Sequence, residues 1–205
     1  QHPSWEVLNY GTPGYGTYQC LLTLERVLPK LSSPSLVIYG FLEHHLVRNI
    51  APPSWRAVLN RDRRQKIYIP YVSVDQNGAL VRHPAALYKQ WPLSHSMAIV
   101  KFAEVMWLAT HESLKDNREM DAAWQLILIE IRDLCIRHGC RFVVALFPLA
   151  HQNEKQFYIN FFKLNNIEFV DCDIALSKEF LLEKDPSHPN TKANKIWAEV
   201  IGKAL

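Results

Sequence analysis

Residues 141–147 read RFVVALF, and this run decides the fold class. It is apolar on both faces of an extended chain, which is typical of a strand buried on both sides within a parallel sheet. Residues 36–41 (LVIYGF) have the same character, and further strands are predicted at 5–10 and 167–171. Helices are predicted between and after these runs, at 15–28, 121–138, 154–164 and 192–205. This alternation indicates an α/β protein with a mainly parallel sheet.

The composition alone excludes several classes of protein. The chain has 205 residues, of which 48% are hydrophobic and 21% charged, and this excludes disordered, collagen-like and coiled-coil proteins. A net charge of +3 gives no electrostatic reason to expect a nucleic-acid partner. No apolar run reaches the about 18 residues of a membrane-spanning helix, because charged residues interrupt the longest candidate, 127–136. We therefore expect a globular domain without a membrane span.

The cysteines do not suggest a metal site. Cys20, Cys135, Cys140 and Cys172 form no C-x-x-C pair of the kind that zinc sites use. We interpret them as buried thiols. A disulfide between Cys135 and Cys140 is the alternative in an oxidising compartment, and the sequence does not indicate the compartment.

Residues 51–93 interrupt the alternation of strands and helices. Residues 66–74 alternate like a strand, and Asn77-Gly78 is typical of a type I′ hairpin turn before a second strand at 79–81. We interpret 51–93 as an inserted excursion that carries a hairpin, either a lid or a surface loop. Its basic run, 61–66 (RDRRQK), contains no aromatic residue and is interpreted as a solvated loop.

A glycine-rich turn, residues 9–17 (NYGTPGYGT), lies where a predicted strand ends and a helix begins. Glycines there permit positive φ and a close approach of backbone N–H groups to a ligand. Such a turn can hold a phosphate or stabilise an oxyanion, and a tight turn without a ligand is the alternative. The chain has no Gly-Lys-Ser/Thr of a P-loop, and Gly11, Gly14 and Gly16 do not have the Rossmann spacing.

A second motif, residues 185–190 (DPSHPN), precedes the last predicted helix. Its prolines restrict the backbone, which should hold the Asp185 and His188 side chains close together. A carboxylate beside an imidazole sets its tautomer and stabilises the imidazolium, as a general base requires. A loop ion pair or a helix-capping aspartate is the alternative. The glycine-rich turn at the other end of the chain favours the general base.

With these two motifs, the chain resembles the SGNH hydrolases, also called GDSL esterases and lipases. Residues 9–14 are similar to the family's second block, which implies that the Gly14 amide contributes to an oxyanion hole. Residues 185–190 resemble the fifth block, D-x-x-H-P-N, which implies that His188 is the general base and Asp185 its partner. The resemblance implies a flavodoxin-like three-layer sandwich that hydrolyses acyl esters without a cofactor.

The third block of the family, G-x-N-D, departs from its usual form. Leu42 stands where the oxyanion asparagine is expected, and loss of one such donor typically costs about 10²–10³ in rate. His44, His45 and Asn49 are candidates for a substitute donor. We expect no metal at His44-His45, because neighbouring side chains of a strand point to opposite faces.

The first block, the Gly-Asp-Ser turn that bears the nucleophile, has no counterpart. The chain contains no Gly-Asp dipeptide, and no Gly-x-Ser of an α/β-hydrolase elbow. Because it opens on Gln1 shortly before the second block, we expect a single SGNH-like domain, 1–205, whose first strand and serine lie upstream. The missing strand would also expose a sheet edge, so we expect the isolated chain either to keep the missing piece as a separate strand or to pair with a second copy at that edge.

These motifs lead to one principal hypothesis and two alternatives. The principal hypothesis is a serine ester hydrolase, an acyl or acetyl esterase or lipase-like enzyme that acts on a small-molecule or carbohydrate ester. The first alternative is an O-acyltransferase, which would pass the same acyl group to a sugar hydroxyl. The second is a non-catalytic, esterase-like module that binds a glycan or a protein partner.

Overall fold

The computed structural model describes residues 5–60, 66–113, 117–149, 152–174 and 177–205. The chain divides into two compact units, and each is described by itself. The first unit comprises Gln1–Gly11, Leu28–Glu43 and Arg132–Leu205, and the second comprises Thr12–Val27 and His44–Ile131. The predicted excursion, 51–93, lies in the second unit, and most of its basic run, 61–65, falls outside the described residues.

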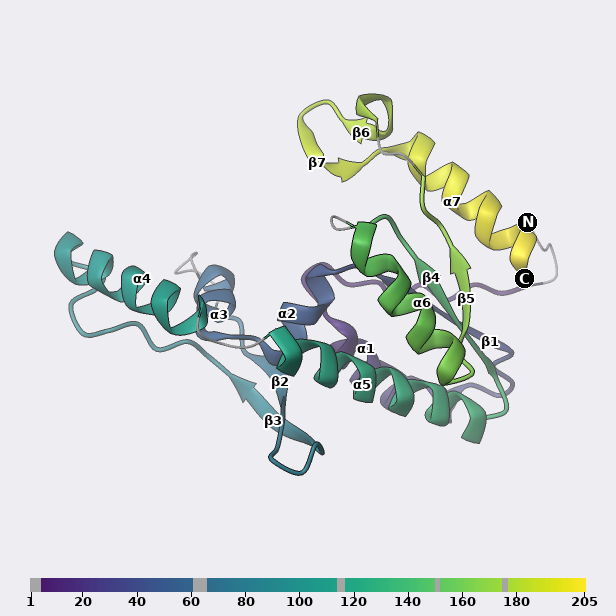
Figure 1. Ribbon diagram of the computed structural model, residues 1–205, viewed down its shortest axis with the longest axis horizontal. Helices are drawn as coiled ribbons and strands as arrows, with labels where there is room; N and C mark the ends of the chain where they lie inside the picture. The colour runs from purple at the N-terminus through teal and green to yellow at the C-terminus, as the bar shows by residue number, and fades with distance from the viewer. Residues whose placement is uncertain (1–4, 61–65, 114–116, 150–151, 175–176) are drawn as a thin grey trace. The chain divides into compact units, whose positions relative to one another are not determined.

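A three-stranded parallel sheet forms the first unit (Figure 1). Its strands are β1 (Leu36–Phe41), β4 (Arg141–Leu146) and β5 (Glu168–Asp171), in the order β1-β4-β5. Every residue of the central strand after its first is buried, as its apolar run predicts. The α/β class with a parallel sheet is therefore confirmed.

The predicted helices of this unit also form. They are α6 (Lys155–Leu164) and α7 (Thr191–Ala204). The long α5 (Asn117–Arg137), which precedes β4 in the chain, belongs to the second unit as far as Ile131 and to this unit from Arg132. Against the sheet, Trp197 of α7 packs with Ala145 and Cys172, and its Nε1 donates to the Cys172 carbonyl at 2.9 Å. Short elements complete the unit: η1 (Leu28–Lys30), η2 (Gln152–Glu154), η3 (Lys178–Phe180), and the antiparallel pair β6 (Leu181–Leu182) and β7 (Asp185–Pro189).

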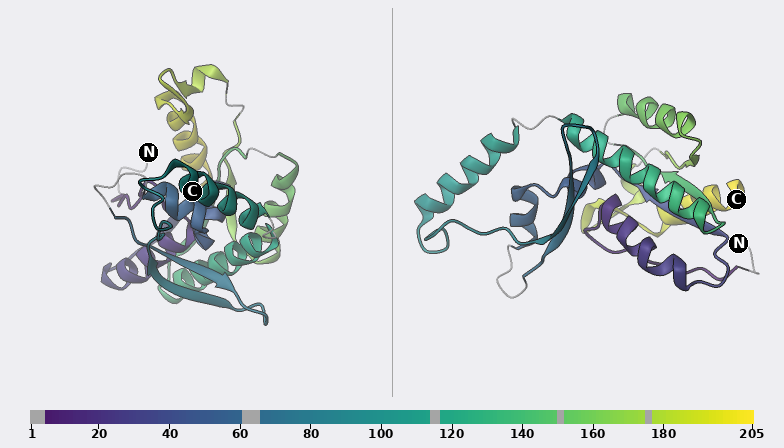
Figure 2. Two further views of the ribbon diagram at one scale, coloured as in Figure 1. Left: turned by 90° about the vertical axis from the view of Figure 1, so that its left-hand side faces the viewer. Right: turned by 90° about the horizontal axis from the view of Figure 1, so that it is seen from below.

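The second unit combines helices with an antiparallel hairpin. Its elements are α1 (Thr17–Val27), α2 (His44–Ile50), α3 (Pro53–Leu59), β2 (Ile69–Val74), β3 (Leu80–Ala86) and α4 (Ala98–Ser113). Figure 2 shows the hairpin as a long twisted ribbon. Arg82 of β3 forms ion pairs with Glu25 of α1 and Glu130 of α5, which tie the hairpin to two helices.

The strand predicted at 5–10 is absent, and this prediction was wrong. The segment has no strand assignment, and Val7 remains 80% exposed. A strand needs a partner for its backbone N–H and C=O groups, and none of the strand pairings among the described residues includes this segment. Ile38 of β1 is also exposed, contrary to the expectation of burial on both faces.

The hairpin turn differs from the predicted type I′. Gly78 has φ +78°, but Asn77 is not among the described residues with positive φ, and a type I′ turn needs both. Asp75 instead accepts from the Gly78 amide through its carbonyl, at 3.0 Å, and from the Asn77 and Ala79 amides through its carboxylate. The loop is therefore of the three-residue type with a left-handed glycine. The asparagine-glycine pair marked the position of the hairpin but not the turn type.

All four cysteines are free thiols, and three of them are buried. This confirms the prediction of buried thiols over a Cys135–Cys140 disulfide. Burial raises the pKa of the Cys20 and Cys172 thiols to about 11, so they are protonated and poorly nucleophilic near neutral pH. Within the described residues, no helix has the length and apolar character to cross a membrane.

Candidate functional site

The predicted acid–base pair is formed in the first unit. Asp185 Oδ2 lies 2.7 Å from His188 Nδ1, and both residues belong to β7 rather than to a loop. Pairing of β7 with β6 extends this segment, with Leu182 opposite Asp185. Side chains three residues apart on a regular strand point to opposite faces, and the register of the β6–β7 pair is irregular, with a shift between Leu181 and Leu182.

Asn190, the residue after β7, fixes the end of this strand. Its side-chain amide donates to the carbonyls of Glu179 and Leu181, at 2.7 and 3.0 Å. Its Oδ1 accepts from the backbone amides of Lys192 and Ala193, which caps α7. One asparagine therefore joins the histidine-bearing strand to the helix that packs against the sheet.

The pair has the geometry of a general base with its orienting group. A hydrogen bond from Nδ1 to the Asp185 carboxylate places the lone pair of the neutral imidazole on Nε2. The carboxylate also stabilises the imidazolium after Nε2 has taken up a proton. Both side chains are solvent-accessible, 51% for Asp185 and 65% for His188, so a substrate can reach the ring.

Within the glycine-rich segment, Thr12–Tyr15 lies in the second unit and forms a type II turn. The Tyr15 amide donates to the Thr12 carbonyl at 3.3 Å, with Pro13 and Gly14 between them. Gly14 has φ +81°, which this turn requires at its third residue and which glycine adopts without strain. A Cβ at Gly14 would meet nothing within 4 Å, so the conformation rather than crowding requires glycine.

Gly16 is required for the opposite reason. A Cβ there would lie 2.8 Å from Arg48 Cβ, 2.8 Å from Asn49 Oδ1 and 3.0 Å from the His45 carbonyl. Helix α2 therefore approaches the start of α1 more closely than any side chain would permit. Arg48 reinforces this contact, because its Nη1 donates to the Tyr15 carbonyl at 3.0 Å.

Asn49, one candidate for a substitute oxyanion donor, is fully buried at this contact. Its Oδ1 accepts from the Tyr18 amide at 3.0 Å, and its Nδ2 donates to Thr17 Oγ1 at 3.3 Å. The side chain thus satisfies an amide in the first turn of α1, which has no partner within the helix. This places Asn49 behind the glycine-rich turn, where it orients α1.

The other two candidates, His44 and His45, are the first residues of α2. Their placement on a strand was wrong, so the argument against a metal that relied on strand geometry does not apply. Burial, with Arg48 and His44 nearby, lowers the pKa of His45 to about 4, so this ring is neutral at pH 7. In the part of the chain that the structure describes, no three His, Cys, Asp or Glu side chains gather as metal ligands.

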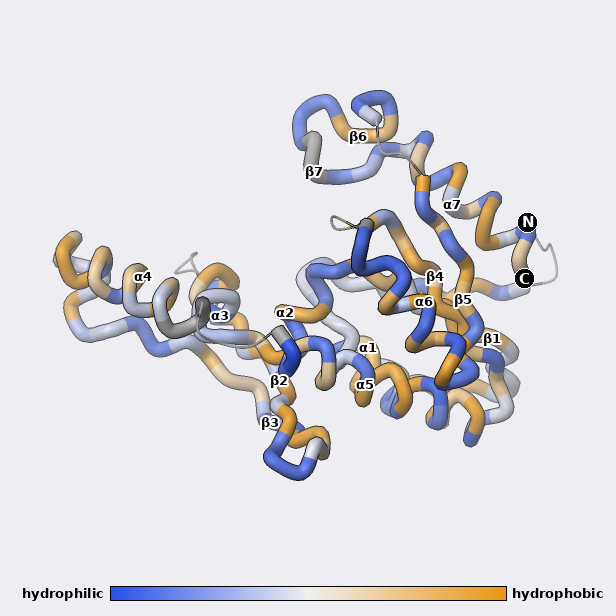
Figure 3. The backbone as a smooth tube through the Cα atoms, in the orientation of Figure 1, coloured by the Kyte–Doolittle hydropathy of each residue, from blue (hydrophilic) through white to orange (hydrophobic). Residues whose placement is uncertain are grey.

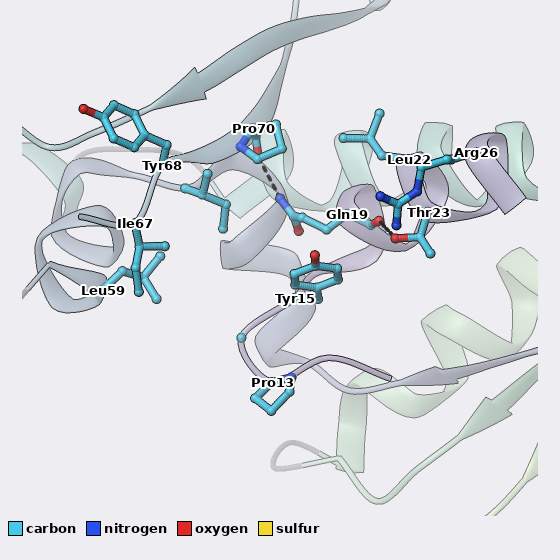
Figure 4. Close-up of a pocket in the computed structure, with 12 residues that line it drawn as sticks. Pro13, Tyr15, Gln19, Leu22, Thr23, Arg26, Leu59, Ile67, Tyr68 and Pro70 are labelled. Atoms are coloured by element: carbon cyan, nitrogen blue, oxygen red, sulfur yellow. Dashed lines mark hydrogen bonds between the residues drawn. The ribbon is translucent and has the colours of Figure 1, made fainter. Parts of the chain in front are cut away.

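Two features of the second unit have no counterpart in the sequence analysis. A pocket of about 310 Å³ lies beside Gly14, between α1 and the segment that enters β2 (Figure 4). On the hairpin, Ser73 Oγ lies 2.7 Å from His83 Nε2, and the His83 ring stacks on Tyr71. Alternation along β2 and β3 could have placed Ser73 and His83 on one face, but the register that brings them together is a tertiary feature.

Comparison of the chain with protein-family models, curated proteins and solved structures gives no match. Its function is therefore inferred from the chemistry of its own residues. Of the predicted site residues, Asp185 and His188 are brought together in the first unit, and Gly14, His45 and Asn49 lie in the second.

Proposed function

We propose that the chain supplies the general base and its carboxylate partner for a serine ester hydrolase of the SGNH type, with a flavodoxin-like sheet. The observation that carries the proposal is the 2.7 Å contact between Asp185 Oδ2 and His188 Nδ1. It is supported by the side chain of Asn190, which ties the end of the strand that carries the pair to α7. The substrate would be a small-molecule or carbohydrate acyl ester, and no cofactor is needed.

The proposed reaction has two steps. A serine hydroxyl from a segment outside the printed sequence attacks the ester carbonyl, and its proton passes to His188 Nε2. The Asp185 carboxylate stabilises the resulting imidazolium. The imidazolium then returns the proton to the departing alkoxide. In the second step, His188 takes a proton from water, which attacks the carbonyl of the acyl-serine. The bond between the acyl carbon and the serine oxygen then breaks, the imidazolium returns its proton to that oxygen, and the acid is released.

The test uses the product of the complete open reading frame and p-nitrophenyl acetate. His188→Ala should lower kcat/KM at least about 10³-fold, and Asp185→Asn should also lower it strongly. His83→Ala and Ser73→Ala are matched controls, because this second serine–histidine contact has no role in the proposed reaction. Absence of turnover, or turnover lost in Ser73→Ala and kept in His188→Ala, would contradict the proposal.

A non-catalytic module is the second candidate, and Leu42 favours it. This leucine stands where the family has its oxyanion asparagine, and it is 39% exposed at the end of β1. A side chain without a donor cannot stabilise an oxyanion. The sequence upstream of Gln1 discriminates the two candidates, because a strand followed by Gly-Asp-Ser would support the enzyme and its absence would support the module.

A further inference from the structure

A second pocket, of about 300 Å³, lies wholly within the second unit and is distinct from the one beside Gly14. Its lining comes from α3, from α4 beside it (Figure 1), and from the segment that follows β3. It combines two cations with two indole rings, from Arg56, Lys89, Trp91 and Trp107. We infer that this pocket binds a small aromatic carboxylate. The inference does not depend on the proposed hydrolase, because no lining residue belongs to the unit that holds the acid–base pair.

The guanidinium of Arg56 is held in place, but no described residue neutralises it. Its Cζ lies 5.0 Å from the centre of the Tyr71 ring, in a cation–π contact. Among the residues that the structure describes, none accepts a hydrogen bond from the guanidinium or forms an ion pair with it, although its Nε is buried. An unpaired cation that is partly withdrawn from water is costly. A carboxylate that accepts from the two terminal nitrogens removes this cost.

Lys89 adds a second positive charge to the same lining. Its side chain is exposed, and it forms no ion pair with any carboxylate in the described part of the chain. The lining residues include no aspartate or glutamate. The pocket therefore has two positive charges and no negative one, which favours an anionic ligand.

Glu104 of α4 positions two walls of the pocket without being part of the lining. Its carboxylate accepts from the Tyr88 hydroxyl at 2.7 Å, from the Trp91 amide at 2.8 Å and from the Ser94 hydroxyl. Because Trp107 follows Glu104 by three residues on the helix, the same turn of α4 supplies the second indole. The pocket is thus preformed by contacts within the second unit.

The two indoles favour an aromatic ligand over a sugar. The ring centres of Trp91 and Trp107 are 5.8 Å apart and the planes are inclined by 55°, so a third ring cannot fit between them. A ligand ring can instead pack against the free face of one indole. The lining has no aspartate, glutamate, asparagine or glutamine, the side chains that commonly bind sugar hydroxyls. A volume of about 300 Å³ is at the small end of ligand pockets, which suits one ring or two fused rings with a carboxylate.

The first experiment compares two ligands that differ in charge. The product of the complete open reading frame is titrated by calorimetry with 2-naphthoate, an aromatic carboxylate, and with 2-naphthamide, its neutral analogue. We expect saturable binding of 2-naphthoate at one site, and at least about tenfold weaker binding of the amide, which lacks the charge-assisted hydrogen bonds. Equal affinities, or no binding of 2-naphthoate at millimolar concentration, would overturn the inference.

The second experiment locates the carboxylate. Arg56→Gln should weaken the binding of 2-naphthoate at least about tenfold. Arg26→Gln is the matched control, because it removes the same charge from an exposed residue of the second unit that lines the other pocket. Its affinity should equal that of the wild type, and equal weakening by the two substitutions would overturn the assignment. Lys89→Gln, at an exposed position, should weaken binding about two- to fivefold and provides a second variant if Arg56→Gln does not fold.

The third experiment tests the aromatic part of the ligand. Trp107→Ala should weaken the binding of 2-naphthoate at least about fivefold. Phe102→Ala is the control on the same helix, since Phe102 is 67% exposed and does not line the pocket, and it should leave the affinity unchanged. Glucuronate, an acidic sugar, should bind at least about tenfold more weakly than 2-naphthoate. Tighter binding of glucuronate, or an affinity that Trp107→Ala does not alter, would refute an aromatic ligand.

Discussion

Individual glycines and polar side chains hold the start of α1 in place, and each does so for a different physical reason. Glycine is required at position 14 because φ is positive there, and at position 16 because α2 lies too close for a side chain. Asn49 is required because its side chain accepts a hydrogen bond from the Tyr18 amide. Substitutions at these three positions should therefore lower the free energy of unfolding for different physical reasons. The two predictions at the scale of residues follow from this contact.

Gly16→Ala should lower the free energy of unfolding by about 1–3 kcal/mol, because a methyl group cannot be placed 2.8 Å from Arg48 Cβ and Asn49 Oδ1 without moving α2. Urea denaturation followed by circular dichroism measures the change. Gly202→Ala is the control. It lies in α7, where an added Cβ would meet nothing within 4 Å, so it should be neutral or up to about 1 kcal/mol stabilising. If the two substitutions changed the free energy of unfolding equally, the close approach of α2 to Gly16 would be contradicted.

His45 should make stability depend on pH. Its pKa is lowered from 6.5 to about 4 in the folded protein, so between these pH values the unfolded chain binds a proton that the folded chain does not. The free energy of unfolding should therefore fall as the pH decreases from 6.5 to 4, by about 2–3 kcal/mol from this group. Urea midpoints at pH 7 and pH 4.5 measure the effect. His45→Gln should reduce the difference between them, and an unchanged difference would contradict the burial of the ring.

Among the elements, α4 is unusual because several of its large apolar side chains are exposed, among them Ile99, Phe102, Val105 and Met106. Figure 3 shows apolar residues at several points along this helix. Its packed face carries Glu104 and Leu108, which are 4% and 7% exposed. Burial alone would raise the pKa of Glu104, but hydrogen bonds from Ser94, Tyr88 and the Trp91 amide outweigh it and lower the pKa. This carboxylate therefore fastens the preceding loop to the helix.

The two faces of α4 should respond differently to truncation. Leu108→Ala should destabilise the protein by about 2–4 kcal/mol, because it leaves a cavity on the packed face. Phe102→Ala should change stability by less than about 0.5 kcal/mol, because Phe102 is 67% exposed. Thermal or urea unfolding of both variants measures this. A larger loss for Phe102→Ala than for Leu108→Ala would mean that the helix packs through its other face.

At the scale of the whole molecule, the important feature is the unpaired edge of the parallel sheet at β1. β1 is an edge strand, and among the described strands it pairs with β4 alone. Exposed strand edges recruit other strands, and natural proteins often protect them with lysine. The exposed apolar segment 5–10 belongs to the same unit.

We expect the 205-residue chain to self-associate through the β1 edge, and Ile38→Lys to reduce this association. Size-exclusion chromatography with light scattering, over a range of concentrations, measures the molar mass. Leu164→Lys is the control, because Leu164 is 82% exposed at the end of α6 and belongs to no strand. A monomer at every concentration, or equal association of the two variants, would contradict the prediction.

The sequence pattern was sufficient to predict those features whose interacting residues lie close together in the sequence. The apolar run of β4, the Pro13-Gly14 turn and the contact between Asp185 and His188 all depend on residues within a few positions of one another. The sequence alone predicts the burial of an apolar strand and a positive φ at a glycine. It also predicts that two side chains three residues apart can come within reach of one another.

Tertiary structure decided the features that depend on distant residues. The segment 5–10 was predicted to be a strand and does not form one, because a strand is stable only where a second strand pairs with it. The fit of Gly16 against α2, the burial that lowers the pKa of His45, and the pocket beside Gly14 each join segments about 30 residues or more apart, and no local pattern encodes such contacts. Sequence determined the α/β class and the acid–base pair, whereas long-range packing determined which strands pair and which side chains lie in reach of Gly14.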